Sequence, residues 1–180
     1  MAQTYTVTAA GVAFGNNKSM LAVFNGSGSG RILRIKRIWV LNNQTSAVTG
    51  VLTTWTLRRI TASSGGSAQS AVRHDSDSET VASITQVSLA SGATITLATG
   101  ADGTPFRTWV WSNDEPAASA GTSDELECVV PLNCIFDAAT GDADIEPIVL
   151  REGEGITVQH AGSTTVGVVD VLCEFTMAAS

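Results

Sequence analysis

Residues 31–61 read RILRIKRIWVLNNQTSAVTGVLTTWTLRRIT, and this stretch decides the fold class. Apolar and polar residues alternate as far as Ile35, the alternation shifts by one position across Lys36 and Arg37, and it resumes at Ile38. Alternation is typical of a half-buried β-strand, and a shift of one position indicates a β-bulge. The pattern therefore predicts a long strand with a bulge that re-aims its basic side chains.

The second half of the stretch also alternates, with apolar or β-branched residues on one face: Val51, Thr53, Trp55 and Leu57. This phase breaks near Arg59 and Ile60. Because a polar segment separates the two runs, we expect them to pair as a hairpin in which Trp39 and Trp55 are large apolar anchors.

Further β-type segments follow the same logic along the chain, over residues 3–8, 20–24, 81–89, 93–98, 106–111, 125–136, 146–151, 155–160 and 166–177. The clearest is the last, which places five apolar residues on one face: Val169, Val171, Cys173, Phe175 and Met177. We expect this final strand to be central in its sheet. Glycine or β-branched alternation breaks every candidate amphipathic helix, so the sequence predicts an all-β protein.

A chain of 180 residues is long enough for one domain with its own core. We expect a single domain over residues 1–180, an antiparallel, jelly-roll-like β-sandwich of about nine to ten strands. Residues up to about 30 are expected to form a flexible N-terminal segment, which ends in the glycine-rich run at 26–30. Residues 62–80 are polar and aperiodic, which predicts a long excursion loop.

The surface is poor in charge, since 15% of the residues are charged while Ser and Thr together number 40. Typical soluble domains have about 25% charged residues. Such a surface is typical of one covered by neighbouring subunits, and a neutral Ser/Thr-rich β-surface is the alternative.

The charges are also segregated along the chain. Residues 1–74 hold eight basic residues and no acidic one, and residues 75–180 hold two basic and seventeen acidic residues, for a net charge of −7. The net negative charge disfavours direct nucleic-acid binding. We expect basic strands to pair with acidic ones inside one sheet or across a subunit contact.

Three cysteines, Cys128, Cys134 and Cys173, have no metal-binding spacing, and their odd number gives no disulfide framework. They are expected to be free thiols in a reducing compartment. No apolar run approaches the roughly 20 residues of a membrane helix, and no signal peptide is recognised, so we expect no membrane association and a cytosolic origin.

Candidate chemistry is sparse. Acidic residues that could form a calcium site are Asp137, Asp142, Asp144 and Glu146, but they lack the EF-hand order, and a solvated acidic loop is the favoured interpretation. The run HDSDSE at 74–79 has the same two interpretations. His74 and His160 could each act as a general base only with a nucleophile that the sequence does not mark. No phosphate-binding or hydrolase motif occurs, so we expect no enzyme activity and no cofactor.

Five segments together resemble small structural proteins of tailed-bacteriophage virions: GRILRIKRIWVLNNQT (30–45), LRRITASSGGSA (57–68), WVWSNDEPAAS (109–119), IEPIVLREGEGITVQH (145–160) and VGVVDVLCEFT (166–176). The resemblance implies a capsid-decorating or minor virion protein, assembled in the host cytoplasm, whose partner is a major capsid or other virion protein. It carries no catalytic residues. Residues 151–155 would form a tight hairpin turn, which their two glycines also permit.

Two functions from different classes follow. The first is a structural virion protein that forms a homo-oligomer, with a trimer expected. Its subunit contact would join Arg58 and Arg59 to acidic residues of a neighbour, and two tryptophans would supply the apolar area. These interface candidates are Arg58, Arg59, Trp109, Trp111, Asp114 and Glu115. The second is a carbohydrate-binding or hydrolytic β-sandwich that uses Trp109 or Trp111 against sugar rings.

Overall fold

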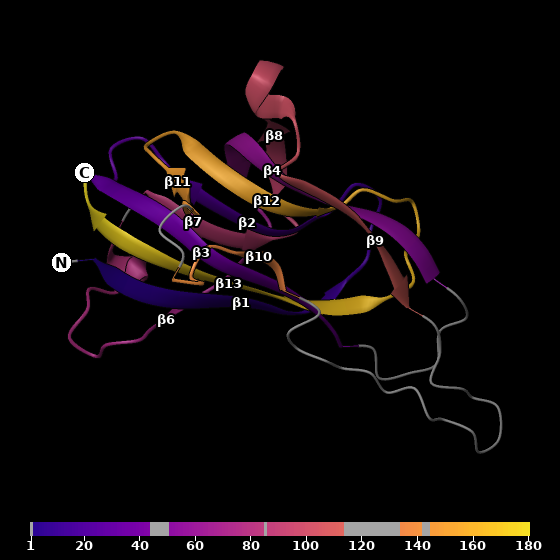
Figure 1. Ribbon diagram of the computed structural model, residues 1–180, viewed down its shortest axis with the longest axis horizontal. Coiled ribbons are helices and arrows are strands. Elements are labelled where there is room, and N and C mark those ends of the chain that lie inside the picture. The colour runs from indigo at the N-terminus through magenta and orange to yellow at the C-terminus, as the bar shows by residue number, and fades with distance from the viewer. Residues whose placement is uncertain (1, 44–50, 85, 114–133, 142–144) are drawn as a thin grey trace.

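The computed structural model describes residues 2–43, 51–84, 86–113, 134–141 and 145–180, which form two packed antiparallel sheets (Figure 1). Sheet A contains β1 (Gln3–Ala13), β3 (Arg31–Asn42), β6 (Ala71–Arg73), β10 (Cys134–Asp137), β11 (Ile148–Leu150) and β13 (Val168–Ala179). Sheet B contains β2 (Ser19–Asn25), β4 (Val51–Ser64), β5 (Ser67–Ala68), β7 (Val87–Ser91), β8 (Thr94–Leu97), β9 (Arg107–Asn113) and β12 (Glu154–His160). Two short 3₁₀ turns, η1 (Val81–Ser83) and η2 (Gly100–Gly103), complete the described elements. The predicted all-β sandwich is confirmed.

The strand order is that of a jelly roll. The first four strands pair, in order, with the last strands taken backwards: β1 with β13, β2 with β12, β3 with β10 and β11, and β4 with β8 and β9. Successive members of this series alternate between sheets A and B. The chain therefore resembles one long hairpin rolled into a sandwich, which is the jelly-roll arrangement. Short added strands at the sheet edges raise the number of strands above the nine to ten expected.

The hairpin predicted within residues 31–61 is wrong. β3 lies in sheet A beside β13, and β4 lies in sheet B beside β12. The two apolar faces meet across the sandwich, because Ile38 and Val40 of β3 share one core cluster with Trp55 and Leu57 of β4. Alternation correctly gave each strand a buried face, but it did not determine whether the two strands lie side by side or face each other.

The bulge predicted in β3 is confirmed. Arg37 lies opposite Glu174 of β13, and Ile35 lies opposite the next residue, Phe175, so that Lys36 is the extra residue. Ile35 and Ile38 are both buried, whereas Lys36 and Arg37 are partly exposed. The bulge therefore allows two consecutive basic side chains to lie on the outer face of sheet A.

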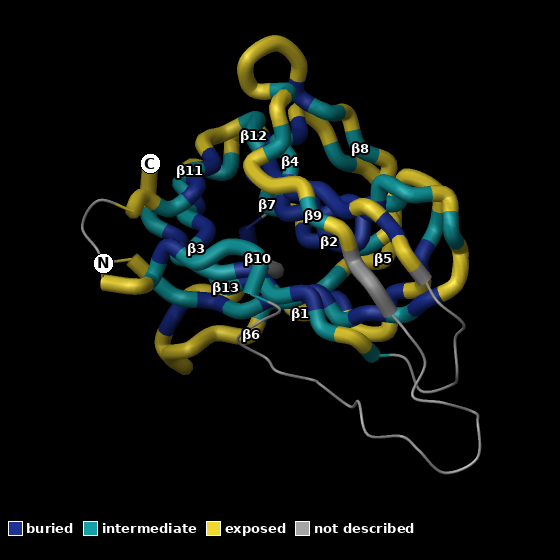
Figure 2. The backbone as a smooth tube through the Cα atoms, turned by 45° about the vertical axis from the view of Figure 1, so that its right-hand side comes forward, coloured by how far each residue is buried: buried dark blue, intermediate teal, exposed yellow. Residues whose placement is uncertain are grey.

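One core cluster joins side chains from both sheets, and Figure 2 colours the buried residues dark blue. β13 lies in the middle of sheet A between β1 and β3, as expected for the final strand. Its five predicted inward residues are all buried: Val169, Val171, Cys173, Phe175 and Met177. On β1, Tyr5 stacks on Phe175 at a ring distance of 5.5 Å, which ties the first strand to the last.

The first 30 residues differ from the expected flexible segment. β1 and β2 occupy residues 3–13 and 19–25 and contribute fully buried side chains, among them Tyr5, Val7 and Met20. The expected excursion loop over 62–80 is also more regular, because β4 continues to Ser64 and β5 and β6 follow it. The predicted strand over 125–136 lies outside the described residues except for β10.

The outer faces of the two sheets differ. On sheet B, a second small cluster forms from Ala22, Ile60, Ala90 and Ala93, with Leu97 of β8 packed against it. Ala22 alternates with the core residues Leu21 and Val23, so this cluster lies on the outer side of the sheet. On sheet A, the described outward residues form no such cluster. The described part of the chain has no helix with the length and apolar character needed to cross a bilayer.

Candidate functional site

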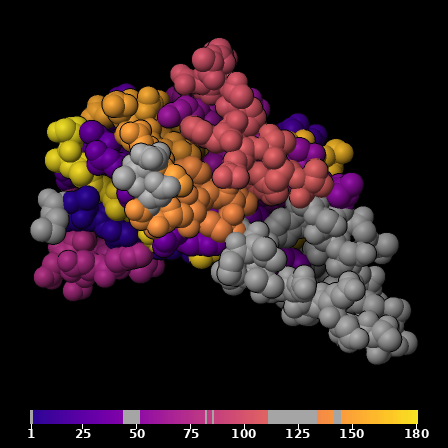
Figure 3. All heavy atoms as spheres, viewed as in Figure 1, coloured from indigo at the N-terminus to yellow at the C-terminus, as the bar shows by residue number. Residues whose placement is uncertain are grey.

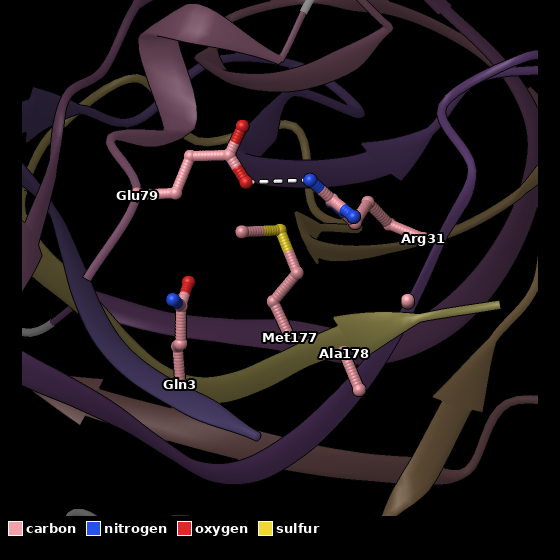
Figure 4. Close-up of a pocket in the computed structure, with 6 residues that line it drawn as sticks. Gln3, Arg31, Glu79, Met177 and Ala178 are labelled. Atoms are coloured by element: carbon pink, nitrogen blue, oxygen red, sulfur yellow. Dashed lines mark hydrogen bonds and ion pairs between the residues drawn. The ribbon is translucent and has the colours of Figure 1, made fainter. Parts of the chain in front are cut away.

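A small pocket lies where the ends of β1, β3 and β13 meet the connection between β6 and β7. Its volume is about 180 Å³, and six residues line it: Gln3, Arg31, Glu79, Met177, Ala178 and Ala179 (Figure 4). Ligand pockets usually measure roughly 300–1,000 Å³, so this one is small for an organic substrate. Nothing in the sequence had marked this set, because its members come from four separate segments.

Hydrogen bonds hold three of the lining residues, Gln3, Arg31 and Glu79. Arg31 Nη2 lies 2.5 Å from Glu79 Oε2, and the Tyr5 hydroxyl lies 2.7 Å from the Glu79 carbonyl oxygen and 2.6 Å from Gln3 Oε1. Burial raises the pKa of Tyr5, and the Glu79 carboxylate raises it further, so Tyr5 stays protonated. These contacts pin the β6–β7 connection across the end of the sandwich. They provide no pair of nucleophile and base.

The two histidines considered as bases are both held by hydrogen bonds. His160 is completely buried, and its Nδ1 lies 2.7 Å from the Gly15 carbonyl oxygen. Because a carbonyl only accepts, Nδ1 carries the proton, and Nε2 accepts a 2.7 Å hydrogen bond from the Thr53 hydroxyl. Burial lowers the pKa of His160, although the Gly15 hydrogen bond opposes this. His74 Nε2 lies 2.8 Å from the exposed Thr6 Oγ1.

Two aromatic rings pack against His160. Phe14 stacks on the imidazole at 4.9 Å, and Trp55 meets it edge-on at 5.4 Å. A Cβ at Gly162 would overlap Thr53 Oγ1, so only glycine fits there without a shift. His160 therefore joins β12 to β4 and to the β1–β2 connection as a structural residue, with no access to a substrate.

The acidic residues considered for calcium do not converge in the described structure. Asp137 Oδ1 accepts hydrogen bonds from Ala139 N at 2.8 Å and from Arg37 Nε at 3.1 Å, and these lower its pKa. Glu146 is exposed, and Asp142 and Asp144 lie outside the described residues. Within the described ranges, no group of three or more metal-ligating side chains is found, and this includes the 74–79 run.

The interface candidates take different positions. Arg58 Nη2 donates to the Gly103 carbonyl at 2.9 Å, and the Arg59 guanidinium lies 5.1 Å from the Phe106 ring centre. Arg59 also lies 3.9 Å from Glu154. Both arginines are therefore engaged within their own chain, which the sequence did not indicate.

The aromatic candidate that the structure describes also packs inward. Trp109 of β9 is half-buried, and its ring lies 6.1 Å from the ring of Trp55 in the core. Trp111 lies opposite Thr53 in the backbone pairing of β9 with β4. Asp114 and Glu115 lie outside the described residues. The exposed apolar residues on this part of sheet B are instead Leu52 and Val110.

Ion pairs explain the charge segregation at least in part. Each described pair joins a basic residue of β3 or β4 to an acidic residue later in the chain: Arg31 to Glu79, Arg37 to Asp137 and Glu174, and Arg59 to Glu154. Arg37 and its two partners lie on three neighbouring strands. Pairing of basic with acidic strands inside one sheet, one of the two expected arrangements, is therefore present.

A second polar cluster joins two turns at one end of the sandwich. The Glu152 carboxylate accepts hydrogen bonds from Gly28 N at 2.9 Å and Gly30 N at 2.8 Å, and these lower its pKa. The 151–155 turn is tight, as expected, with Glu154 N donating to the Arg151 carbonyl. It is not a hairpin, because β11 belongs to sheet A and β12 to sheet B.

The described thiols are structural. Cys173 is buried in the core, and burial raises its pKa well above the usual range. Cys134 is half-buried, its pKa is also raised by burial, and both thiols are free. Cys128 lies outside the described residues.

Both histidines, and the pocket residues Gln3, Arg31 and Glu79, thus have hydrogen-bond partners within the chain. Comparison with protein-family models, with curated proteins and with solved structures found no match to this chain.

Proposed function

We propose that this chain is a non-enzymatic structural protein of a tailed-bacteriophage virion, which decorates or cements the capsid as a homo-oligomer. Its partner would be the major capsid protein or another virion protein, and assembly would take place in the host cytoplasm. The observation that carries the proposal is the commitment of polar groups to the fold: both histidines, Tyr5 and Glu79 are held by contacts within the chain. Such a chain offers surfaces for binding other proteins.

The fold and composition support the same proposal. Jelly rolls occur in viral capsid proteins, and also in lectins and cupins, so the fold alone does not select among them. The low charge of the surface and the phage-like sequence segments favour the virion role. The carbohydrate-binding alternative is weakened because Trp109 packs on Trp55.

The direct test is mass spectrometry of purified particles from the phage that encodes this chain. We expect the chain in the particles in a fixed ratio to the major capsid protein. Its presence in the infected-cell lysate but not in gradient-purified particles would contradict the proposal. A tryptophan-fluorescence titration with a glycan panel tests the alternative, and a saturable, sugar-dependent change would favour that function.

A further inference from the structure

The outer face of sheet A has a half-buried apolar centre. Trp39 of β3 lies directly opposite Leu172 of β13, and Thr8 of β1 lies on the other side of Leu172. Trp39 and Leu172 are partly exposed, and neither belongs to the core cluster or to the apolar side chains packed against it. A tryptophan at the centre of a partly exposed sheet face is typical of an interface anchor.

Charges lie at opposite ends of this face. Arg34, opposite Thr176, and the bulge residue Lys36 lie toward one end, and Asp170, opposite Leu41, lies toward the other. In the described part of the chain, no carboxylate lies within ion-pairing distance of Arg34 or Lys36. Between the two ends, Arg37 is balanced by Glu174 and Asp137.

These charges favour another copy of the same face over a nucleic acid. The outward residues of β3, β10 and β13 contribute three basic groups (Arg34, Lys36, Arg37) and three acidic groups (Asp137, Asp170, Glu174), so the face is neutral overall. A nucleic-acid surface needs an excess of positive charge. A two-fold axis that lies between two such faces, perpendicular to the strands, would bring the basic end of each onto the acidic end of the other.

The dimensions of the face are adequate for such a contact. β3 and β13 have 12 residues each, which corresponds to about 40 Å, and five strand positions span about 19 Å. The available area is on the order of 700 Å², close to the roughly 800 Å² per partner of a stable interface.

We infer that two copies of this chain pack through the outer faces of their A sheets, with Trp39 beside the two-fold axis and Arg34 and Lys36 facing Asp170 of the other copy. This inference rests on the proposed homo-oligomeric function. An isologous contact gives a dimer, or a hexamer if a three-fold axis is added, and it does not by itself give the trimer expected from the sequence.

The test compares one substitution on two faces. Thr8→Arg places a long cation beside Trp39 and Leu172, and Thr54→Arg places the same side chain at an exposed position on the outer face of sheet B. Mass is measured by light scattering from about 1 to 100 μM, and folding is checked by circular dichroism. We expect Thr8→Arg to halve the mass of the wild type and Thr54→Arg to leave it unchanged.

Other outcomes separate the two claims. A wild-type oligomer whose mass Thr8→Arg leaves unchanged overturns this inference and leaves the proposed function standing. A wild type that is monomeric throughout overturns the inference and the homo-oligomeric part of the function. A monomeric wild type in which Thr8→Arg blocks uptake into particles would assign the face to another virion protein and also overturns the inference. If Thr8→Arg does not fold, Lys36→Glu replaces it, since that side chain forms no ion pair in the described structure.

Discussion

At the scale of single residues, His160 is a fully buried titratable group. Its imidazole is neutral because both nitrogens have fixed partners and burial disfavours the charged form. A proton on His160 would therefore place a positive charge on a fully buried side chain.

Protonation of His160 should destabilise the fold in mild acid. Its folded pKa lies below the ordinary value of 6.5, so the unfolded chain binds the proton first and stability falls as the pH drops below about 6.5. Urea unfolding between pH 7.5 and 5.5 measures this slope. His160→Asn, which cannot titrate, should show a flatter slope. Equal slopes in wild type and His160→Asn would contradict the assignment.

Glu152 gives a prediction of the same sign in a lower pH range. The Gly28 and Gly30 amides lower the pKa of Glu152. The carboxylate therefore contributes fully to folding stability above its ordinary pKa of 4.5, and this stability is lost as the pH falls through the lower pKa of the folded state. Glu152→Ala should speed hydrogen exchange at the amides of residues 28 and 30 at neutral pH. Glu146→Ala, at an exposed position, is the matched control. Unchanged exchange in Glu152→Ala would show that the two turns do not depend on this carboxylate.

At the scale of elements, β13 should be the strand least tolerant of charge. Val171 is fully buried in the middle of sheet A, so Val171→Asp leaves an unpaired buried charge that costs several kcal/mol and is expected to abolish soluble folding. Thr176→Asp, on the outer side of the same strand beside Arg34, should change stability by less than about 1 kcal/mol. Soluble yield and denaturant midpoints decide this, and a cooperatively folded Val171→Asp protein would contradict it.

Alternation predicted which side of each strand is buried but not which strand is its neighbour. The pattern in β13 gave its five buried residues, and the phase shift at Lys36 gave the bulge, because both are local properties. The pairing of β3 with β13 joins residues far apart in sequence. A hairpin of β3 with β4 would join residues much closer in sequence, and it is equally consistent with the alternation. The pocket was not predicted for the same reason, since Gln3, Arg31 and Glu79 meet only after the sheets have formed.

At the scale of the whole molecule, the sandwich needs no covalent cross-link. Cys173 is enclosed by the core, and Cys134 is half-buried and free. Mass analysis after denaturation without reductant should therefore find three free thiols. In the native protein, iodoacetamide should label Cys173 far more slowly than after unfolding. The buried sulfur is inaccessible to the reagent, and its raised pKa keeps it as the unreactive thiol. A mass lower by two hydrogens would reveal a disulfide.

The rolled strand order has a consequence for synthesis. β1 and β3 both pair with β13, so two early strands of sheet A wait for a strand that is synthesised more than 120 residues after them. Until then, the edges of β1 and β3 that pair with β13 stay open, and such long-range pairing is slow and prone to aggregation. A stalled nascent chain that ends before residue 168 should therefore remain protease-sensitive and bound by chaperones, whereas a chain that also exposes residues 168–179 can complete the sheet from its centre.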